Sequence, residues 1–215
     1  MSALSSLFSP SAVVVEAPIR RVDDLLWDEE LAYVRSAVPK RRAEFGTARV
    51  CAREALGRLG LAPVALVPGS DRAPVWPPGV VGSITHTQDD CAVVLHRSPP
   101  MQSVGVDVEM LNGLDEELFA TVLTARERSW TISHGRERRE DLAALLFSAK
   151  EAYYKCQYPL SKTFLDFHDV EIEVDLDTKR FVALAQKVVP PSVQRLVGRF
   201  AFDAGRVYCG MELTG

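Results

Sequence analysis

The sequence predicts an α+β fold built from two similar halves. Apolar residues at helical spacing cover residues 40–59, and alternating apolar and polar residues, typical of strands, follow between 80 and 109. The same order of helices and then strands returns over residues 115–158 and 170–212. We therefore expect two pseudo-symmetric α+β halves packed together, residues 1–106 and 107–215. Sequence self-similarity between the halves is too weak to establish a repeat.

The first half is expected to begin with a strand and two helices. A short strand is predicted around residues 13–15, which are three valines. From Asp28 the pattern becomes helical, and Pro39 separates two helices because proline disfavours helix at the residue before it and suits a first helical turn. The second helix should run from Lys40 to Leu59. Gly60 then stands where a left-handed cap is expected.

A loop and three strands are predicted between residues 61 and 109. Residues 61–79 contain many prolines and glycines, which indicates a loop. Residues 80–86 and 91–96 are rich in strand-forming residues and flank four polar residues, so they predict a hairpin. A third strand should cover residues 103–109.

The second half is expected to be helical first and then to form strands. Residues 115–158 indicate mainly helix, with the last helix beginning near Glu140 and ending at Pro159. Strands are predicted at 170–174 and 181–184. Residues 199–212 predict a hairpin that turns at 203–205.

Composition excludes several classes of protein. Of the 215 residues, 47% are hydrophobic and 25% are charged, as in ordinary globular proteins. No apolar run approaches the ~20 residues needed to cross a bilayer, and the first fifteen residues lack the basic start of a signal peptide, so we expect a cytoplasmic protein. The net charge of −4 argues against non-specific binding of nucleic acid. The four cysteines are scattered, which predicts reduced, mostly buried thiols.

One strand carries two acidic residues on the same face. In the run 103–109, alternation sends the three valines to one side and Gly105, Asp107 and Glu109 to the other. Gly105 would clear space beside the carboxylates, as a ligand-facing strand needs. Hard oxygen ligands so placed suit Mg²⁺. The alternative is that they are solvated acids on a half-buried strand.

A helix in the second half carries a second candidate group. The run Phe147-Ser-Ala-Lys-Glu-Ala-Tyr-Tyr-Lys155 places Glu151 and Lys155 four residues apart, and therefore on one face. The alternative is an ordinary surface ion pair worth about 0.3 to 0.5 kcal/mol.

The first half offers polar residues suited to an anion. Gly82-Ser-Ile-Thr-His86 brings hydroxyls and an imidazole to a strand end, although a lone histidine is as often a structural group. Arg42, Arg49 and Arg53 lie along one helical stripe beside Arg41, and a solvated basic face is the alternative.

Taken together and in this order, the four elements resemble the 4'-phosphopantetheinyl transferases. The Gly-Val-Asp-Val-Glu and Phe-Ser-Ala-Lys-Glu-Ala-Tyr-Tyr-Lys stretches match two signature motifs of that family, and the resemblance spans about residues 41–160. The sequence is most similar to the long, Sfp-like class in which one chain holds two pseudo-symmetric halves, and within it to the actinobacterial branch. The features that indicate this branch are Pro39-Lys-Arg-Arg-x-Glu-Phe45, Cys51-Ala-Arg53 and Tyr158-Pro-Leu160.

The resemblance implies a Mg²⁺-dependent transfer, with Mn²⁺ as an alternative metal. Coenzyme A would be the substrate, and its 4'-phosphopantetheine group would pass to a serine of an acyl, peptidyl or aryl carrier protein. A monomer without nucleic-acid or membrane partners is expected. The implied roles are a metal site at Asp107, Glu109 and Glu151, with Glu151 as general base and Lys155 at the leaving group. The implied coenzyme A contacts are Arg41, Arg49, Arg53, Arg72, Ser83, Thr85, His86, Lys150 and Lys155.

Two points stay open at this level. Arg41 is favoured for the 3'-phosphate by its place in the family motif, whereas helical geometry alone favours Arg42 together with Arg49. Many family members carry Gly-Lys-Pro where this chain has Asp71-Arg-Ala-Pro74, so Arg72 is the candidate replacement for that lysine. The competing functions are a coenzyme A or nucleotide phosphohydrolase and a non-catalytic coenzyme A binding module.

Overall fold

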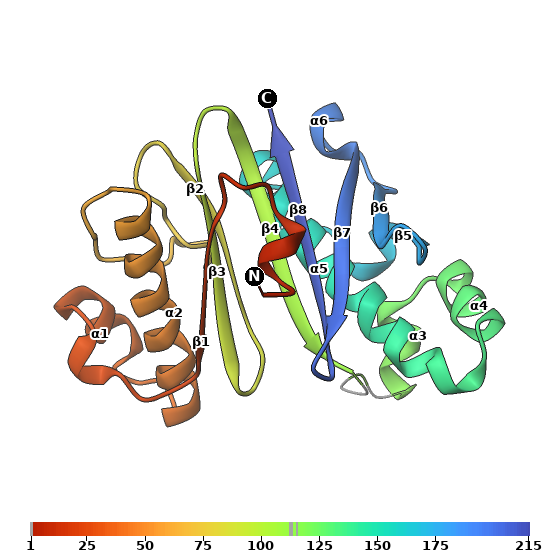
Figure 1. The fold of residues 1–215 in the computed structure, drawn as a ribbon, viewed down its shortest axis with the longest axis horizontal. Coiled ribbons are helices and arrows are strands. Elements are labelled where there is room, and N and C mark those ends of the chain that lie inside the picture. The colour runs from red at the N-terminus through yellow and green to blue at the C-terminus, as the bar shows by residue number, and fades with distance from the viewer. Residues whose placement is uncertain (1, 112–113, 115) are drawn as a thin grey trace. The chain divides into compact units, whose positions relative to one another are not determined.

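The computed structural model describes residues 2–111, 114 and 116–215 and divides the chain into two compact units. The N-terminal unit comprises Pro10–Val104 with the last two residues, and the C-terminal unit comprises Gly105–Leu213 with the N-terminal residues through Ser9. Each unit combines helices with an antiparallel sheet (Figure 1), so the predicted α+β class is confirmed.

The N-terminal unit is a three-stranded sheet packed on one long helix. Its strands β1 (Val13–Pro18), β3 (Asp90–Arg97) and β2 (Val80–His86) lie in the order β1-β3-β2. Helix α1 (Asp28–Val34) precedes α2 (Pro39–Arg58), and α2 contacts β1 and β3. The unit also contains the 3-10 helix η2 (Asp23–Leu25). The predicted strand, helices and hairpin of this half are therefore confirmed.

Local sequence explains where α2 begins and ends. Pro39 occupies the first turn, where a missing N–H costs nothing. Past the end of the helix, Gly60 adopts φ +72°, a left-handed conformation that glycine adopts without steric cost. The apolar side of the helix, including Ala52, Ala55 and Leu56, is fully buried against the sheet.

The C-terminal unit is a five-stranded sheet with helices against it. The strands follow the order β4-β8-β7-β6-β5. Their bounds are β4 (Met101–Met110), β5 (Val170–Asp175), β6 (Arg180–Ala185), β7 (Arg195–Asp203) and β8 (Arg206–Thr214). Helix α5 (Arg139–Ser161) packs on β5, β6 and β7. The smaller helices are η1 (Ser5–Leu7), η3 (Glu116–Leu118), α3 (Phe119–Val122), α4 (Ala125–Ser133), η4 (Arg136–Arg138), η5 (Phe167–Asp169) and α6 (Pro191–Gln194).

Two boundaries in the C-terminal unit differ from expectation. Helix α5 continues past Pro159 to Ser161, although proline removes one backbone donor and crowds the carbonyl four residues earlier. The chain leaves the helix at Lys162 with φ +51°. Strand β7 starts four residues before the predicted Arg199. The predicted turn is confirmed, with Ala204 and Gly205 both at positive φ. Residue 115, the predicted start of the helical region, lies outside the described residues.

Candidate active site

Strand β4 and helix α5 bring the acidic residues together within the C-terminal unit. Asp107 is only 3% exposed, and Glu109 is half-buried. The reading of Asp107 as a solvated acid on an open face is therefore wrong. The role expected of Gly105 also needs correction, because a Cβ there would lie 2.0 Å from the Ala152 carbonyl oxygen of α5. Gly105 allows close packing of strand and helix and does not leave space for a ligand.

Lys155 forms its ion pair with Asp107 of strand β4, and not with Glu151 as in the alternative of a surface ion pair. Its Nζ donates to Oδ1 of Asp107 at 2.7 Å. Glu151, one helical turn earlier, is half-buried. Lys155 therefore bonds to Asp107 while its charge also acts on Glu151, and the interpretation as a simple surface ion pair fails.

Two of the three carboxylates, Glu109 and Glu151, have raised pKa values. Burial raises the pKa of Glu109 to about 8, and repulsion from Asp107 and Glu151 adds to this effect, whereas Lys155 opposes it. Burial also raises the pKa of Glu151, with Asp107 contributing in the same direction. Half-buried acids that repel one another are stabilised by a bound cation.

The donor chemistry of these acids fits a hard divalent cation. Carboxylate oxygens are what Mg²⁺ prefers, and only a few protein ligands are needed because the ion keeps several waters. Within residues 2–111, 114 and 116–215, no set of three or more His, Cys, Asp or Glu side chains is already assembled closely enough to hold a metal. The three acids therefore fit the ion by chemistry and charge, without a preformed cage.

A pocket of about 280 Å³ lies beside Glu151. Helix α5 forms one wall, and the segment after it forms the other. The residues that line it are Lys150, Glu151, Tyr154, Phe164, Leu165, Asp166, Phe167 and Val170. The two walls touch through aromatic pairs, Tyr154 with Phe164 at 6.2 Å and Phe147 with Phe167 at 5.5 Å between ring centroids.

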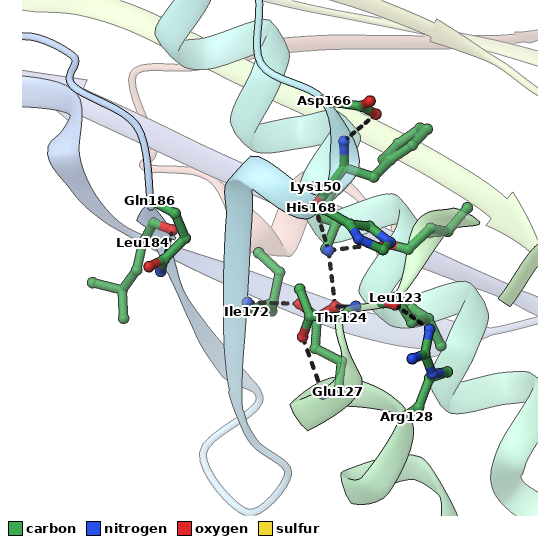
Figure 2. A network of polar contacts seen from close by, with 12 residues as sticks. Leu123, Thr124, Glu127, Arg128, Lys150, Asp166, His168, Ile172, Leu184 and Gln186 are labelled. Carbon is green, nitrogen blue, oxygen red and sulfur yellow. Dashed lines mark hydrogen bonds and ion pairs between the residues drawn. The ribbon is translucent and has the colours of Figure 1, made fainter. Parts of the chain in front are cut away.

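Lys150 lies in the core, which contradicts the expected phosphate contact. Its side chain is 2% exposed, and Nζ lies 2.8 Å from Oε2 of Glu127. The same nitrogen donates to the carbonyl oxygens of Val122 at 2.9 Å and Phe167 at 2.7 Å. An ammonium group has three donors, so all are committed. Figure 2 shows Lys150 at the centre of this network.

Glu127 was not singled out by the sequence reasoning, although a signal for it exists. It is the N3 residue of α4 and accepts from the backbone N–H of Thr124 at 2.8 Å. The Thr-x-x-Glu spacing of a capping box was visible in the sequence. Its other oxygen accepts from the backbone N–H of Ile172 at 2.8 Å (Figure 2). Burial lowers the pKa of Lys150, and the Glu127 charge opposes that shift.

In the N-terminal unit, Arg41 and His86 come together. Nη1 of Arg41 lies 3.4 Å from Nε2 of His86, and Glu44 lies near both. The Arg41 side chain is half exposed, whereas Arg42 is held by an ion pair with Asp23 at 3.0 Å. Geometry therefore favours Arg41 over Arg42 as a residue able to receive a ligand.

Arg49 is a buried cation, only 5% exposed. Its Nε donates to the Leu66 carbonyl oxygen at 2.6 Å, and the guanidinium lies 3.9 Å from the centre of the Phe45 ring. Burial lowers the pKa of Arg49 to about 10, and the more distant Glu30 charge opposes the shift. Among the described residues, no ion pair is formed by Arg49 within 4.0 Å. A buried cation so placed would be stabilised by an anion.

Arg53 is structural, which contradicts its expected coenzyme A contact. Nη1 pairs with Oε2 of fully buried Glu30 at 2.6 Å, and Nη2 donates to the Leu25 carbonyl oxygen at 2.6 Å. Glu30 also accepts from the backbone N–H of Leu66 at 3.0 Å and of Trp27 at 3.1 Å. Sequence reasoning missed Glu30.

The remaining candidates of this unit differ in accessibility. Ser83 and Thr85 are both 3% exposed, so His86, at 36% side-chain exposure, is the residue of this strand end that reaches solvent. Arg72 lies on the surface in the loop after Leu66, with φ +64°.

Comparisons with known proteins agree with the motifs. Residues 29–96 match the family profile described as 4'-phosphopantetheinyl transferase N-terminal domain, and residues 103–204 match the 4'-phosphopantetheinyl transferase superfamily. The chain is 44% identical to 4'-phosphopantetheinyl transferase Svp of Streptomyces mobaraensis, over 98% of this chain and 89% of that protein. The chain belongs to the 4'-phosphopantetheinyl transferase family.

Two further relatives extend the comparison. The chain is 34% identical to 4'-phosphopantetheinyl transferase PptT of Mycobacterium tuberculosis, over 86% of this chain and 85% of that protein. It is 38% identical to enterobactin synthase component D of Salmonella typhi, over 61% of this chain and 55% of that protein. The resemblance read from the motifs and the assignment as an enzyme are confirmed.

Two further expectations about this transferase can be compared with its structure. The four cysteines, Cys51, Cys91, Cys156 and Cys209, are buried thiols outside any disulfide bond, as predicted. None of the helices in the described part of the chain has the length and apolar character that crossing a bilayer requires.

Proposed function

We propose that this enzyme transfers the 4'-phosphopantetheine group of coenzyme A to a serine of an apo acyl, peptidyl or aryl carrier protein, with Mg²⁺, in the cytoplasm. The observation that carries the proposal is the cluster of Asp107, Glu109 and Glu151, whose charges interact beside the Lys155 ammonium. Family membership supplies the reaction class. One relative is named as a component of enterobactin synthase, which supports carriers of peptide assembly among the substrates.

Asp107, Glu109 and Glu151 are the residues that would hold the metal. When bound, Mg²⁺ would neutralise the three carboxylates and the pyrophosphate oxygens of coenzyme A, which would otherwise repel each other. The raised pKa values of Glu109 and Glu151 support this assignment, because a bound cation would relieve the burial and the repulsion from Asp107 that raise them.

The protein's own groups would move the proton and balance the charge. The carrier serine oxygen attacks the phosphorus that bears the pantetheine arm, and the bond from that phosphorus to the 3',5'-ADP oxygen breaks. Glu151 takes the serine proton. Its raised pKa lies closer to the pH at which the enzyme works, and a general base is most effective when these two values are similar. Lys155 would stabilise the negative charge on the departing 3',5'-ADP.

Phosphate recognition is proposed for the N-terminal unit. Arg41 and His86, which lie 3.4 Å apart with His86 reaching solvent, and the buried cation Arg49 are the candidates. Arg72 keeps its proposed role as replacement for the family's lysine because its side chain is exposed. Ser83 and Thr85 are proposed to support this strand end from the buried side.

The pocket beside Glu151 is proposed to take part of the pantetheine arm. Its walls are mainly aromatic and aliphatic, and Glu151 lies on its lining next to them. A site of this type buries the uncharged part of a ligand while a few polar groups orient the reacting end.

Incubation with coenzyme A, Mg²⁺ and an apo-carrier tests the proposal. A carrier that gains the mass of one phosphopantetheine, with release of 3',5'-ADP, is the expected product. Free phosphopantetheine with an unmodified carrier would indicate a phosphohydrolase. Coenzyme A binding without any turnover, unaffected by removal of Mg²⁺, would indicate a binding module. Apo-carriers from fatty-acid, polyketide and nonribosomal-peptide assembly would define the substrate range.

A further inference from the structure

The two units contain the same buried clamp between a short helix and a long one. In each, a glutamate at the third position of the short helix pairs with a basic residue of the long helix. The glutamate also accepts from two backbone N–H groups, and the basic residue donates to a backbone carbonyl oxygen. The N-terminal clamp consists of Glu30, Arg53, Trp27 N, Leu66 N and Leu25 O. The C-terminal clamp consists of Glu127, Lys150, Thr124 N, Ile172 N and Val122 O.

Sequence positions confirm that the clamps correspond. The glutamates are residues 30 and 127, the basic residues are 53 and 150, and the accepting carbonyl groups belong to residues 25 and 122, so each of these three pairs is 97 positions apart. The same offset aligns Ala52-Arg-Glu-Ala55 with Ala149-Lys-Glu-Ala152. The clamp is therefore a structural feature of the fold, because it also occurs in the unit that lacks the catalytic acids.

One contact distinguishes the C-terminal clamp. Lys150 has a further donor, which bonds the Phe167 carbonyl oxygen at 2.7 Å. For Arg53 the structure gives no bond of this kind among the described residues. Phe167 belongs to the wall that faces α5 across the pocket, and Glu151 is the neighbour of Lys150. The shared clamp thus gains, in one unit only, a bond to the wall of the candidate active site.

The wall is held against α5 at three successive places. Phe167 packs on Phe147, the Phe167 carbonyl accepts from Lys150, and Phe164 packs on Tyr154. Phe164 is 72% exposed, so it contributes little burial to hold the segment. The hydrogen bond from Lys150 to the Phe167 carbonyl is the polar contact among these three, and Lys150 is the neighbour of Glu151 in the chain.

We infer that Lys150 and Glu127 are positioning residues for the transfer reaction. Glu127 fixes the Lys150 ammonium, and Lys150 fixes the wall segment 164–167 through the Phe167 carbonyl, which sets the width of the pocket beside Glu151. This inference rests on the proposed function. It differs from a phosphate-binding role for Lys150, because neither residue needs to touch the substrate.

The variant Lys150→Arg tests the inference, and Arg53→Lys is the matched control. Arginine at 150 can keep the bonds to Glu127 and Val122, as Arg53 does to Glu30 and Leu25. Its planar guanidinium is not expected to reach the Phe167 carbonyl as well. We expect a folded protein whose kcat/KM for coenzyme A falls about 10- to 100-fold, since displacements near 1 Å can cost that much. Arg53→Lys should stay within about threefold of wild type.

Binding of 3',5'-ADP separates positioning from general damage. This product lacks the pantetheine arm, so its affinity measured by calorimetry should be unchanged in Lys150→Arg. Hydrogen exchange in residues 163–169 should become faster. Equal kcat/KM losses in Lys150→Arg and Arg53→Lys, or a Lys150→Arg rate within twofold of wild type, would overturn the inference.

A milder variant covers the case in which Lys150→Arg does not fold. Glu127→Asp shortens the side chain by one methylene, which should draw the Lys150 ammonium away from the Phe167 carbonyl. We therefore expect a smaller loss of kcat/KM than in Lys150→Arg. Wild-type kcat/KM in folded Glu127→Asp would contradict the inference. If the wild-type enzyme modified no carrier at all, the proposed function would fail instead, and the two failures are distinguishable.

Discussion

Helices α2 and α5 carry nearly the same motif but place it in different surroundings. Glu54 and Arg58 of α2 correspond to Glu151 and Lys155 of α5, 97 positions later. Glu54 is 51% exposed and pairs with Arg58 at 2.6 Å, as an ordinary surface ion pair does. Glu151 is half-buried on the lining of a pocket, and burial raises its pKa. The helix motif by itself therefore does not make an active site.

The strand beside each helix accounts for the difference. Arg58 donates to the backbone carbonyl oxygen of Val14 in β1, whereas Lys155 donates to the side chain of Asp107 in β4. Arg58 thus reaches the run Val13-Val-Val-Glu16, and Lys155 reaches the run Val106-Asp-Val-Glu109. The contacted position is a valine in β1 and an aspartate in β4. The proposed transfer chemistry therefore depends on residues of the strand and of the helix together.

The largest effect is expected from Asp107→Ala. Loss of this carboxylate removes a proposed metal ligand and the partner of Lys155, so transfer should fall about 10³-fold, as when an electrostatic group of a transition state is removed. Circular dichroism should show an intact fold, because removing one of three repelling acids relieves charge. Val14→Ala, at the corresponding place in β1, is the control and should keep wild-type turnover. Wild-type turnover by folded Asp107→Ala would remove the metal assignment.

Lys155→Ala should also lower kcat strongly, by about 10²-fold, while the affinity for coenzyme A changes less. The physical reason is that Lys155 is proposed to act on charge that develops as the 3',5'-ADP leaves. Arg58→Ala breaks the analogous exposed pair in α2 and should change the free energy of unfolding by less than about 1 kcal/mol without changing kcat. Similar kcat values for the two variants, measured with saturating coenzyme A, would contradict a catalytic role for Lys155 that Arg58 lacks.

Neighbouring arginines in α2 provide a smaller and more local test. Arg41→Ala and His86→Ala should each weaken coenzyme A binding about tenfold, because a lost hydrogen bond to a charged group costs about 1.5 to 3 kcal/mol. Arg42→Ala breaks the ion pair with Asp23 and should leave the affinity within about twofold. Calorimetry checks all three variants. A loss of affinity in Arg42→Ala that matches that of Arg41→Ala would reverse the assignment between them.

Stability of the metal-free protein should depend on pH through Glu109. Its pKa is raised from 4.5 to about 8, so between these values the folded chain holds a proton that the unfolded chain has lost. Its contribution is therefore fully present below about pH 4.5 and is lost as the pH rises towards 8. Chemical denaturation of wild type and Glu109→Gln should show their difference in free energy of unfolding changing in that direction. A difference independent of pH would contradict the raised pKa.

Local signals in the sequence were sufficient for most of the fold. Pro39 and Gly60 marked the ends of α2, and Ala204 with Gly205 formed the expected turn. Alternation predicted the strands because one face of each packs on a helix. The continuation of α5 past Pro159 was missed, because proline normally ends a helix and this local signal was followed.

The site was predicted less completely, because burial of a charge depends on distant partners. From the sequence, Arg53 and Lys150 were predicted to contact coenzyme A. In the structure they form ion pairs with Glu30 and Glu127, each 23 positions earlier in the chain. That equal spacing was present in the sequence, but only the structure shows that it matters. The role of Gly105 was missed for the same reason, since the Ala152 carbonyl that it accommodates lies in another element.

Single-turnover transfer by Glu151→Gln and Glu54→Gln tests the central claim most directly. Both variants make the same change at corresponding positions of the two helices, with saturating coenzyme A, Mg²⁺ and an apo-carrier whose mass reports the product. The account predicts a loss of 10² to 10⁴-fold for Glu151→Gln, since it removes the proposed general base, and a wild-type rate for Glu54→Gln. A Glu151→Gln rate within a few-fold of wild type would contradict it.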